Sequence, residues 1–193
     1  MIFKDGVVLS EIDPEDIEWM RNQRNDPSMR RYFREWKDIS KEKQKEWYSE
    51  KGNNLNPNHV YFKIEHNPTI GSAYTGGTLV GCCGLHYVDW RLRSAEFGVF
   101  LSKESRGKGI GKKALELLFD FGFKEMNLHK IWAEVYDNNS SIELYRKLGF
   151  VDEGVLRDNY FCEGKYGNSI IMSVLENEWR SKYGDKPLWE IIL

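Results

Sequence analysis

Hydrophobic residues in the middle of the chain alternate between the period of a strand and that of a helix. Short apolar runs predict four strands, over residues 60–65, 78–88, 96–101 and 131–136. Between the last two runs, apolar residues recur every three or four positions, at Ile110, Ala114, Leu117, Leu118 and Phe121. This spacing predicts one apolar helix face that packs on a sheet.

The two ends of the chain add hairpins and further helices. A strand over 7–12 leads into a helix over 15–25, with Asp13 as the N-cap and Pro14 at the first helical position. The remaining predicted elements are a bent helical region over 28–51, a loop or hairpin over 67–77, a helix over 140–148 ended by Gly149, and two strands around Glu163 and Gly164. This order predicts an α/β fold, with a central mixed, mostly antiparallel sheet and helices on both faces.

Composition narrows the class of protein. With 40% hydrophobic and 30% charged residues, the chain is typical of a soluble globular protein, and 193 residues suit one domain over 1–193. Its core is expected over about 7–175, followed by a polar and aromatic tail over 176–193. The net charge of −2 creates no field for nucleic acid or an anionic membrane, and no apolar run approaches the roughly 20 residues of a membrane helix. We therefore expect a cytoplasmic protein with neither kind of partner.

The cysteines and the C-terminal segment bear on disulfides, metal binding and oligomeric state. Cys82, Cys83 and Cys162 fit neither a disulfide framework nor a zinc spacing, so we expect packing residues and predict no metal site. The segment 187–193 is apolar enough to dock on its own domain or on another subunit, which leaves a homodimer open.

Residues 106–113, Arg-Gly-Lys-Gly-Ile-Gly-Lys-Lys, form a glycine-rich turn between a predicted strand and the predicted central helix. Three glycines let the backbone approach a ligand, and the first amides of a helix favour an anion. A P-loop ends in Lys-Ser or Lys-Thr, and a dinucleotide fingerprint has another glycine spacing, so neither fits. The open readings are an Arg-x-x-Gly-x-Gly phosphate turn and a turn without a ligand.

Arg-x-x-Gly-x-Gly resembles the acetyl-CoA pyrophosphate loop of the GNAT superfamily of N-acetyltransferases. Residues 138–150 resemble the Asn-x-x-Ala-Ile-x-Leu-Tyr-x-Lys-Leu-Gly-Phe signature of the same superfamily, with Ser141 in place of alanine. The likeness extends from 7 to about 175 and is greatest to the branch of ribosomal-protein N-terminal acetylases, spermidine acetyltransferases and amino-sugar acetyltransferases. It is weakest over 28–77, which such enzymes vary to suit their substrates.

The resemblance implies an enzyme that transfers acetyl from acetyl-CoA to a primary amine by direct attack in a ternary complex. The turn would hold the pyrophosphate, while the backbone of the preceding strand and Asn138 would contact the pantetheine arm. The expected cofactor-binding residues are Phe100, Leu101, Arg106, Gly107, Lys108, Gly109, Ile110, Gly111, Lys112, Asn138 and Lys147.

Two residues carry the implied chemistry. Tyr145 matches the proposed general acid for the departing thiolate, but a tyrosine near pKa 10 protonates a thiolate near 8.5 only at a cost of roughly 2 kcal/mol, which favours hydrogen bonding instead. Glu96 is the candidate that accepts the proton of the amine, directly or through water. The alternatives are a Tyr145 that only packs and a Glu96 that faces solvent or pairs with Arg91 or Arg93. His86 has no spaced partner and is expected to be an ordinary polar residue.

The acceptor amine stays open. Arg30 and Arg34, four residues apart on a predicted helix, suit an anionic group such as that of a nucleotide-linked amino sugar or an acidic peptide. Glu35 resembles in position a polyamine-contacting glutamate and would attract a cationic amine. Trp36 and Tyr160 could line an acceptor groove, although buried packing and a solvated charged helix also explain this region. The expected acceptor is a polyamine or an amino sugar, with a protein N-terminus or a non-catalytic CoA-binding module as alternatives.

Overall fold

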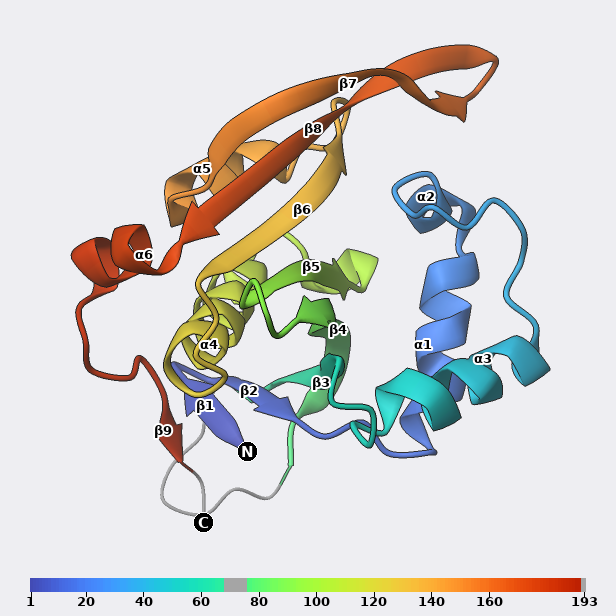
Figure 1. Cartoon of the computed structure of the whole chain (residues 1–193). Coiled ribbons are helices and arrows are strands. Elements are labelled where there is room, and N and C mark those ends of the chain that lie inside the picture. Colours follow the sequence, from blue (N-terminus) through green and yellow to red (C-terminus); the bar gives the residue numbers. More distant parts are fainter. Residues whose placement is uncertain (68–75, 192–193) are drawn as a thin grey trace.

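The computed structural model describes residues 1–67 and 76–191 (Figure 1). Within these ranges, one nine-stranded sheet has the order β7-β8-β6-β5-β4-β3-β2-β1-β9. Its strands are β1 (Ile2–Lys4), β2 (Val7–Ser10), β3 (His59–His66), β4 (Thr78–Asp89), β5 (Ser94–Leu101), β6 (Lys130–Tyr136), β7 (Val151–Cys162), β8 (Lys165–Leu175) and β9 (Glu190–Ile191). Only β5 and β6 are parallel neighbours, and the other pairs are antiparallel. The predicted mixed, mostly antiparallel sheet is confirmed.

Helices cover both faces of the sheet, as predicted. One face carries α4 (Ile110–Lys124), α5 (Ile142–Leu148) and α6 (Glu176–Tyr183), and the other carries α1 (Asp16–Asn25), α2 (Pro27–Arg30), α3 (Lys41–Trp47) and the π-helical turn Tyr48–Gly52. The 3-10 turn Lys103–Ser105 leads toward α4. Successive side chains of β4 point to opposite faces of the sheet. Cys82 packs with Met20 of α1, whereas the next residue, Cys83, belongs to the larger core under α4.

The N-terminal helices differ in detail from the prediction. Asp13 is not an N-cap, because its backbone N–H donates to Asp16 (2.8 Å) and its carboxylate pairs with Lys63 (2.7 Å), so α1 begins at Asp16. The prediction of one bent helical region over 28–51 is also wrong, because α2 ends at Arg30 and residues 31–39 contain no helix. Of the loop predicted over 67–77, residues 68–75 lie outside the described residues.

Residues 176–191, expected as a polar and aromatic tail, contribute α6 and β9. Trp179 is completely buried, and its indole N–H donates to the carboxylate of Asp120 on α4 (2.9 Å). The other oxygen of Asp120 accepts from the backbone N–H of Leu188 (2.7 Å), and Lys124 supplies the neutralising charge (2.7 Å). A buried carboxylate requires such partners, so Asp120 joins α4 to the C-terminal segment.

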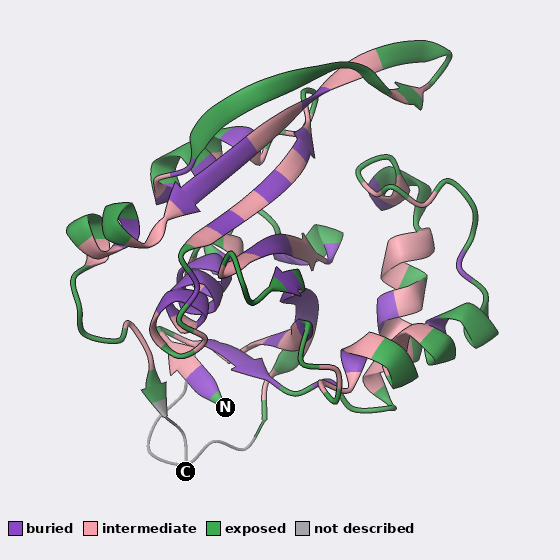
Figure 2. Ribbon diagram, viewed as in Figure 1, coloured by how far each residue is buried: buried purple, intermediate pink, exposed green. Residues whose placement is uncertain are grey.

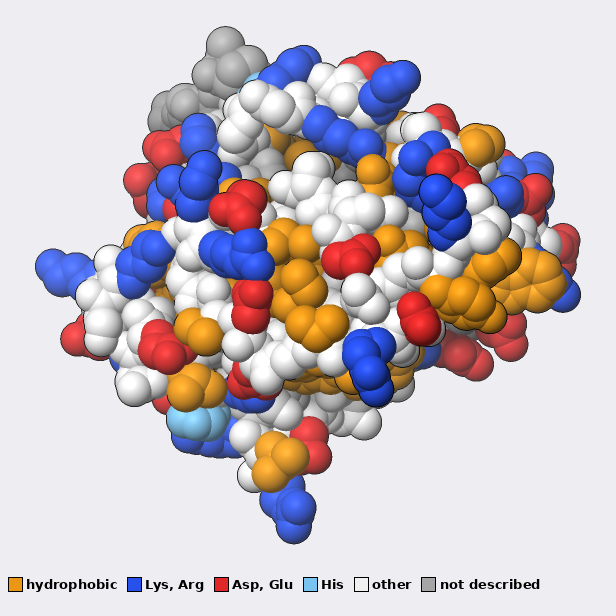
Figure 3. All heavy atoms as spheres, turned by 90° about the horizontal axis from the view of Figure 1, so that it is seen from above, with side chains coloured by type: hydrophobic (Ala, Val, Ile, Leu, Met, Phe, Trp, Pro, Cys, Tyr) orange, Lys and Arg blue, Asp and Glu red, His pale blue; other side chains and the backbone are white. Residues whose placement is uncertain are grey.

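The outermost strand β7 is exposed over nearly its whole length, in contrast to β8 beneath it (Figure 2). Seen from above, hydrophobic side chains are interspersed with charged ones on this side of the molecule (Figure 3), and Val151, Val155 and Leu156 of β7 are among the exposed hydrophobic residues. Among the described helices, none is both long and apolar enough to cross a membrane.

Candidate active site

The sheet opens between its two parallel strands. The ladder between β5 and β6 covers only Ser94–Lys130, Ala95–Ile131 and Glu96–Trp132, although β5 continues to Leu101 and β6 to Tyr136. Beyond Glu96 the facing edges of the two strands are not joined by this ladder. Unpaired edge groups of this kind can hydrogen-bond an extended ligand.

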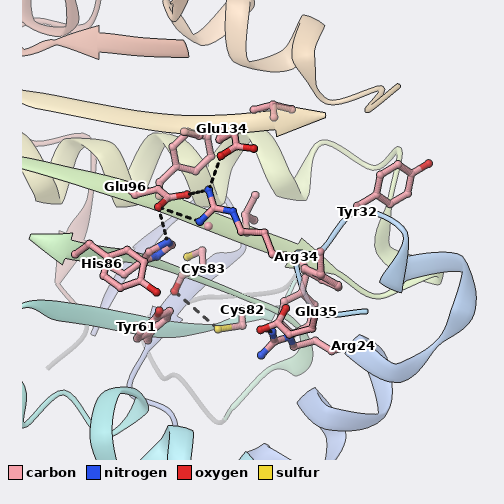
Figure 4. Close-up of a pocket in the computed structure, with 18 of the residues that line it drawn as sticks. Arg24, Tyr32, Arg34, Glu35, Tyr61, Cys82, Cys83, His86, Glu96 and Glu134 are labelled. Atoms are coloured by element: carbon pink, nitrogen blue, oxygen red, sulfur yellow. Dashed lines mark hydrogen bonds and ion pairs between the residues drawn. The ribbon is translucent and has the colours of Figure 1, made fainter. Parts of the chain in front are cut away.

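A cavity of about 310 Å³ occupies the opening, and we call it the central cavity (Figure 4). Strands β3 to β6 form its floor, and α1, α5 and residues 32–35 contribute to its walls. Side-chain alternation divides its lining into two sides. Phe97, Ala133 and Val135 belong to the core under α4, whereas Glu96 and Glu134 lie on the opposite face of the sheet.

Glu96 lies between Arg34 and His86 and pairs with neither Arg91 nor Arg93. The Arg34 guanidinium contacts both carboxylate oxygens, at 2.6 Å and 3.4 Å, and Nε2 of His86 lies 3.7 Å from Oε2. Burial raises the pKa of Glu96, but the contacts with His86 and Arg34 outweigh burial and hold this pKa below its usual value. Glu96 is therefore an ionised carboxylate that faces the central cavity.

Glu134 on β6 lies on the far side of the same arginine. Nη2 of Arg34 is 3.3 Å from Oε2 of Glu134, and Asn159 of β7 donates to Oε1 (2.6 Å). Arg34 thus bridges the two strands where they diverge, with one carboxylate on each strand (Figure 4).

Tyr145 lines the central cavity from the α4 side. Only 6% of its surface is exposed, and its ring packs edge-on against Phe97 (5.1 Å between centroids) and near Phe150 (6.3 Å). Burial raises its pKa to about 12, against a smaller lowering by the Ser141 hydroxyl. Tyr145 therefore both packs against the core and lines the cavity.

The glycine turn fits a bound anion. Gly107 and Gly109 have φ angles of 72° and 78°, a region that favours glycine, and a Cβ at either position meets no atom within 4 Å. Gly109 is the N-cap of α4 and provides no side chain, so the first amides of a 15-residue helix are uncapped. At Gly111 a Cβ would lie 3.3 Å from Leu101, so glycine also lets the helix approach β5.

The other predicted cofactor residues surround this turn. Lys108 and Lys112 are exposed, Ile110 is buried in the core, and Arg106 donates from Nε to the carbonyl of Leu101 (3.2 Å). Phe100 turns to the α1 side, where it packs near Trp19 and Phe33.

In the signature segment, Asn139 lines the central cavity, whereas the predicted Asn138 is exposed and does not. Lys147 is exposed, and its backbone carbonyl accepts a hydrogen bond from Lys182.

The predicted substrate residues do not form one cluster. Arg30 pairs with Asp38 and Arg34 with Glu96, so the shared helical face expected for the two arginines is wrong, because the helix stops at Arg30. Glu35 lines the central cavity and pairs with Arg24 (2.7 Å), which outweighs the effect of burial and lowers the pKa of Glu35.

Trp36 and Tyr160 line an adjacent groove, which shares Arg34 and Glu35 with the central cavity. Buried packing is wrong for Trp36, which is 79% exposed. The hydroxyl of Tyr160 donates to Asp137 (2.8 Å), and its ring stacks on Tyr136.

Glu134 was not identified from the sequence, which predicted only an ordinary polar role for His86. The period of β6 contains a signal for Glu134, because it has the same parity as Trp132, the partner of Glu96. No local pattern indicates His86, which reaches Glu96 only because β4 and β5 pair His86 with Glu96 directly. In the part of the chain that the structure describes, no group of three or more His, Cys, Asp or Glu side chains is arranged to hold a metal ion.

Comparison with known proteins agrees with this geometry. A family model described as an acetyltransferase (GNAT) domain matches residues 7–151. The spermidine N(1)-acetyltransferase of Escherichia coli K12 is 29% identical over 185 residues, which cover 92% of this chain and 90% of that protein. The enzyme of that name from Vibrio cholerae is 26% identical over 177 residues, covering 91% and 96%.

The solved structures agree as well. A crystal structure of spermidine N-acetyltransferase from Vibrio cholerae in complex with CoA and spermine has a TM-score of 0.81 and 25% sequence identity, and covers 91% of this chain and 99% of its own. The family match spans more than half of the chain and includes the glycine turn and Tyr145. The chain therefore belongs to the GNAT acetyltransferase family and is an N-acetyltransferase that uses acetyl-CoA.

Proposed function

We propose that this enzyme acetylates a primary amine of an aliphatic polyamine. The observation that carries the proposal is the pair of carboxylates, Glu96 and Glu134, on the two strands that diverge at the central cavity. A cationic amine is attracted by such a pair, whereas a phosphorylated or carboxylated acceptor is repelled. The names of the two relatives, both spermidine N(1)-acetyltransferases, support the same acceptor class.

The residues of the glycine turn suit acetyl-CoA. The uncapped amides at the start of α4 and the nearby Lys108 and Lys112 provide donors and positive charge for the pyrophosphate. The free edge of β5 beyond Glu96 provides backbone groups for the pantetheine arm. Acetyl-CoA supplies the acetyl group as a thioester.

Glu96 is better suited to orient the amine than to deprotonate it directly. An alkyl ammonium with a pKa near 10.4 and a carboxylate below 4.5 differ by about six units, so direct transfer costs roughly 8 kcal/mol. The pKa of Glu96 is lowered further while Arg34 contacts it. Glu96 therefore binds and orients the amine, whose proton is relayed through water to a base in bulk solution, so that the neutral amine can attack.

Tyr145 acts on the thiolate side. Its buried side chain lines the central cavity from the α4 side, opposite the carboxylates. With a pKa of about 12, it donates a hydrogen bond to the sulfur that gains negative charge and keeps its own proton.

A thiol-release assay with acetyl-CoA tests the acceptor class. Spermidine, glucosamine 6-phosphate and a peptide with a free N-terminus are compared at equal concentration. We expect kcat/KM for spermidine to exceed the other two by at least about 100-fold, because only spermidine combines a primary amine with further positive charge. Preference for the sugar or the peptide contradicts the polyamine proposal, and CoA binding without turnover of any amine favours a non-catalytic module.

A further inference from the structure

We propose that Glu96 and Glu134 together form the subsite for the reacting ammonium group, and that Arg34 is an internal cation that fills this subsite until the acceptor displaces it. This inference rests on the proposed function, because it specifies where a cationic acceptor binds and what it must replace. Arg34 contacts Glu96 and Glu134, which lie 62 and 100 positions from it along the chain.

The two carboxylates are fixed in place, and each presents one oxygen to Nη2 of Arg34. Glu134 accepts from Asn159 at Oε1 (2.6 Å), and Asn159 also contacts Ser169 (3.0 Å), so Oε2 is the oxygen that faces Arg34. At Glu96, His86 lies beside Oε2, and Oε1 makes the 2.6 Å contact with Arg34. Oε1 of Glu96 and Oε2 of Glu134 therefore converge on the same nitrogen, Nη2 of Arg34.

The cation differs from the carboxylates in how it is held. The side chains of Glu96 and Glu134 are 8% and 17% exposed and project from paired strands, whereas that of Arg34 is 52% exposed and comes from the non-helical residues 31–39. Arg34 can consequently leave toward solvent without disrupting the sheet. When Arg34 leaves, the two carboxylates lose a positive charge, and an ammonium group that enters from the central cavity replaces it.

Neighbouring arginines do not share this position. Arg31 pairs with Glu163 on the hairpin between β7 and β8 (3.5 Å), and Arg30 pairs with Asp38. Arg31 therefore offers a matched control, three residues from Arg34 on the same segment but directed elsewhere.

A tethered cation acts as an intramolecular competitor with an effective concentration in the millimolar range. It weakens every cationic acceptor by the same factor, because each must displace it from the same subsite. We expect Arg34→Gln to lower KM for spermidine at least about tenfold and KM for a simple monoamine, 1-aminobutane, by the same factor, with kcat changed less than about threefold. Arg34→Lys keeps a tethered cation and stays within about threefold of the wild-type KM, and Arg31→Gln within about twofold.

The role of Glu134 is tested without its competitor. In the Arg34→Gln background, adding Glu134→Gln raises KM for spermidine at least about tenfold, because one of the two anionic partners of the ammonium is lost. Circular dichroism and thermal melts confirm that each variant is folded.

The outcomes separate the two proposals. Turnover of spermidine by the wild type with an unchanged or raised KM in Arg34→Gln overturns the inference and leaves the polyamine function intact. A KM unaffected by Glu134→Gln in the Arg34→Gln background overturns the Glu134 subsite. Absence of spermidine turnover by the wild type refutes the proposed function and the inference with it.

Discussion

Replacing Tyr145 by Phe tests how this residue assists the departure of the thiolate. With a pKa of about 12, Tyr145 lies about 3.5 units above a thiol near 8.5, so proton transfer to the sulfur costs roughly 5 kcal/mol. Hydrogen bonding avoids that cost. A hydrogen bond to a charged group contributes about 1.5–3 kcal/mol, which corresponds to a loss of roughly 10- to 150-fold in kcat.

Phenylalanine preserves the packing at this position. The ring of Tyr145 contacts Phe97 and Phe150, and these contacts require no hydroxyl. We therefore expect a loss of stability of no more than about 1.5 kcal/mol, from the lost contact with Ser141. The affinity for CoA, measured by isothermal titration, should be unchanged, and the loss of activity should be confined to kcat. Between about pH 8 and about pH 10, the kcat profiles of wild type and variant should have the same shape.

Two results would refute this reasoning. A fall in kcat of less than about threefold would leave Tyr145 with packing alone. An alkaline decline of kcat that is present in the wild type and absent from Tyr145→Phe would assign its hydroxyl to proton transfer.

Three further predictions follow from the fold and the site. Gly109→Val should lower CoA affinity at least about tenfold while the protein stays folded, because the strain of roughly 1–2 kcal/mol is tolerable and the side chain projects over the turn. Gly164→Val, at φ 80° in a hairpin, is the matched control with similar strain, and equal affinity loss in both variants contradicts the turn as the phosphate site. Asp120→Ala should destabilise the protein by about 3–5 kcal/mol in urea unfolding, because the buried Lys124 loses its counter-charge and keeps only the backbone carbonyl of Lys186 as an acceptor. A loss below about 1 kcal/mol argues against this junction. Because the pKa of Glu96 is lowered on folding, its contribution to stability is present above the unfolded value of 4.5 and is lost as pH falls through the folded pKa. The difference in melting temperature between wild type and Glu96→Gln should therefore shrink below about pH 4.5, and a difference independent of pH contradicts the ion pair.

Local patterns were sufficient for the central elements. The helix over α4 follows from its apolar spacing, and the glycines before it indicate a turn with positive φ angles at Gly107 and Gly109. The boundaries of β3 to β6 were predicted within a few residues for the same reason, because each is a short apolar run. Tyr145 was found through its signature and lies beside the central cavity.

Long-range contacts account for what the sequence did not reveal. Residues 31–39 read as helix by composition, but the side chain of Asn25 binds both the N–H and the carbonyl of Ile39, at 2.8 Å and 3.0 Å, and fixes the end of this segment. The bridge from Arg34 to Glu96 and Glu134 joins three segments of the chain. Propensity and periodicity concern near neighbours and contain no information about such pairings.

A crystal structure of the protein with CoA and spermidine tests the central claim most directly. We expect the diphosphate on the amides of residues 107–112, a spermidine ammonium within hydrogen-bond distance of Glu96 and Glu134, and Arg34 displaced from both carboxylates. Spermidine bound elsewhere while Arg34 still bridges Glu96 and Glu134, or a diphosphate away from the glycine turn, would contradict it.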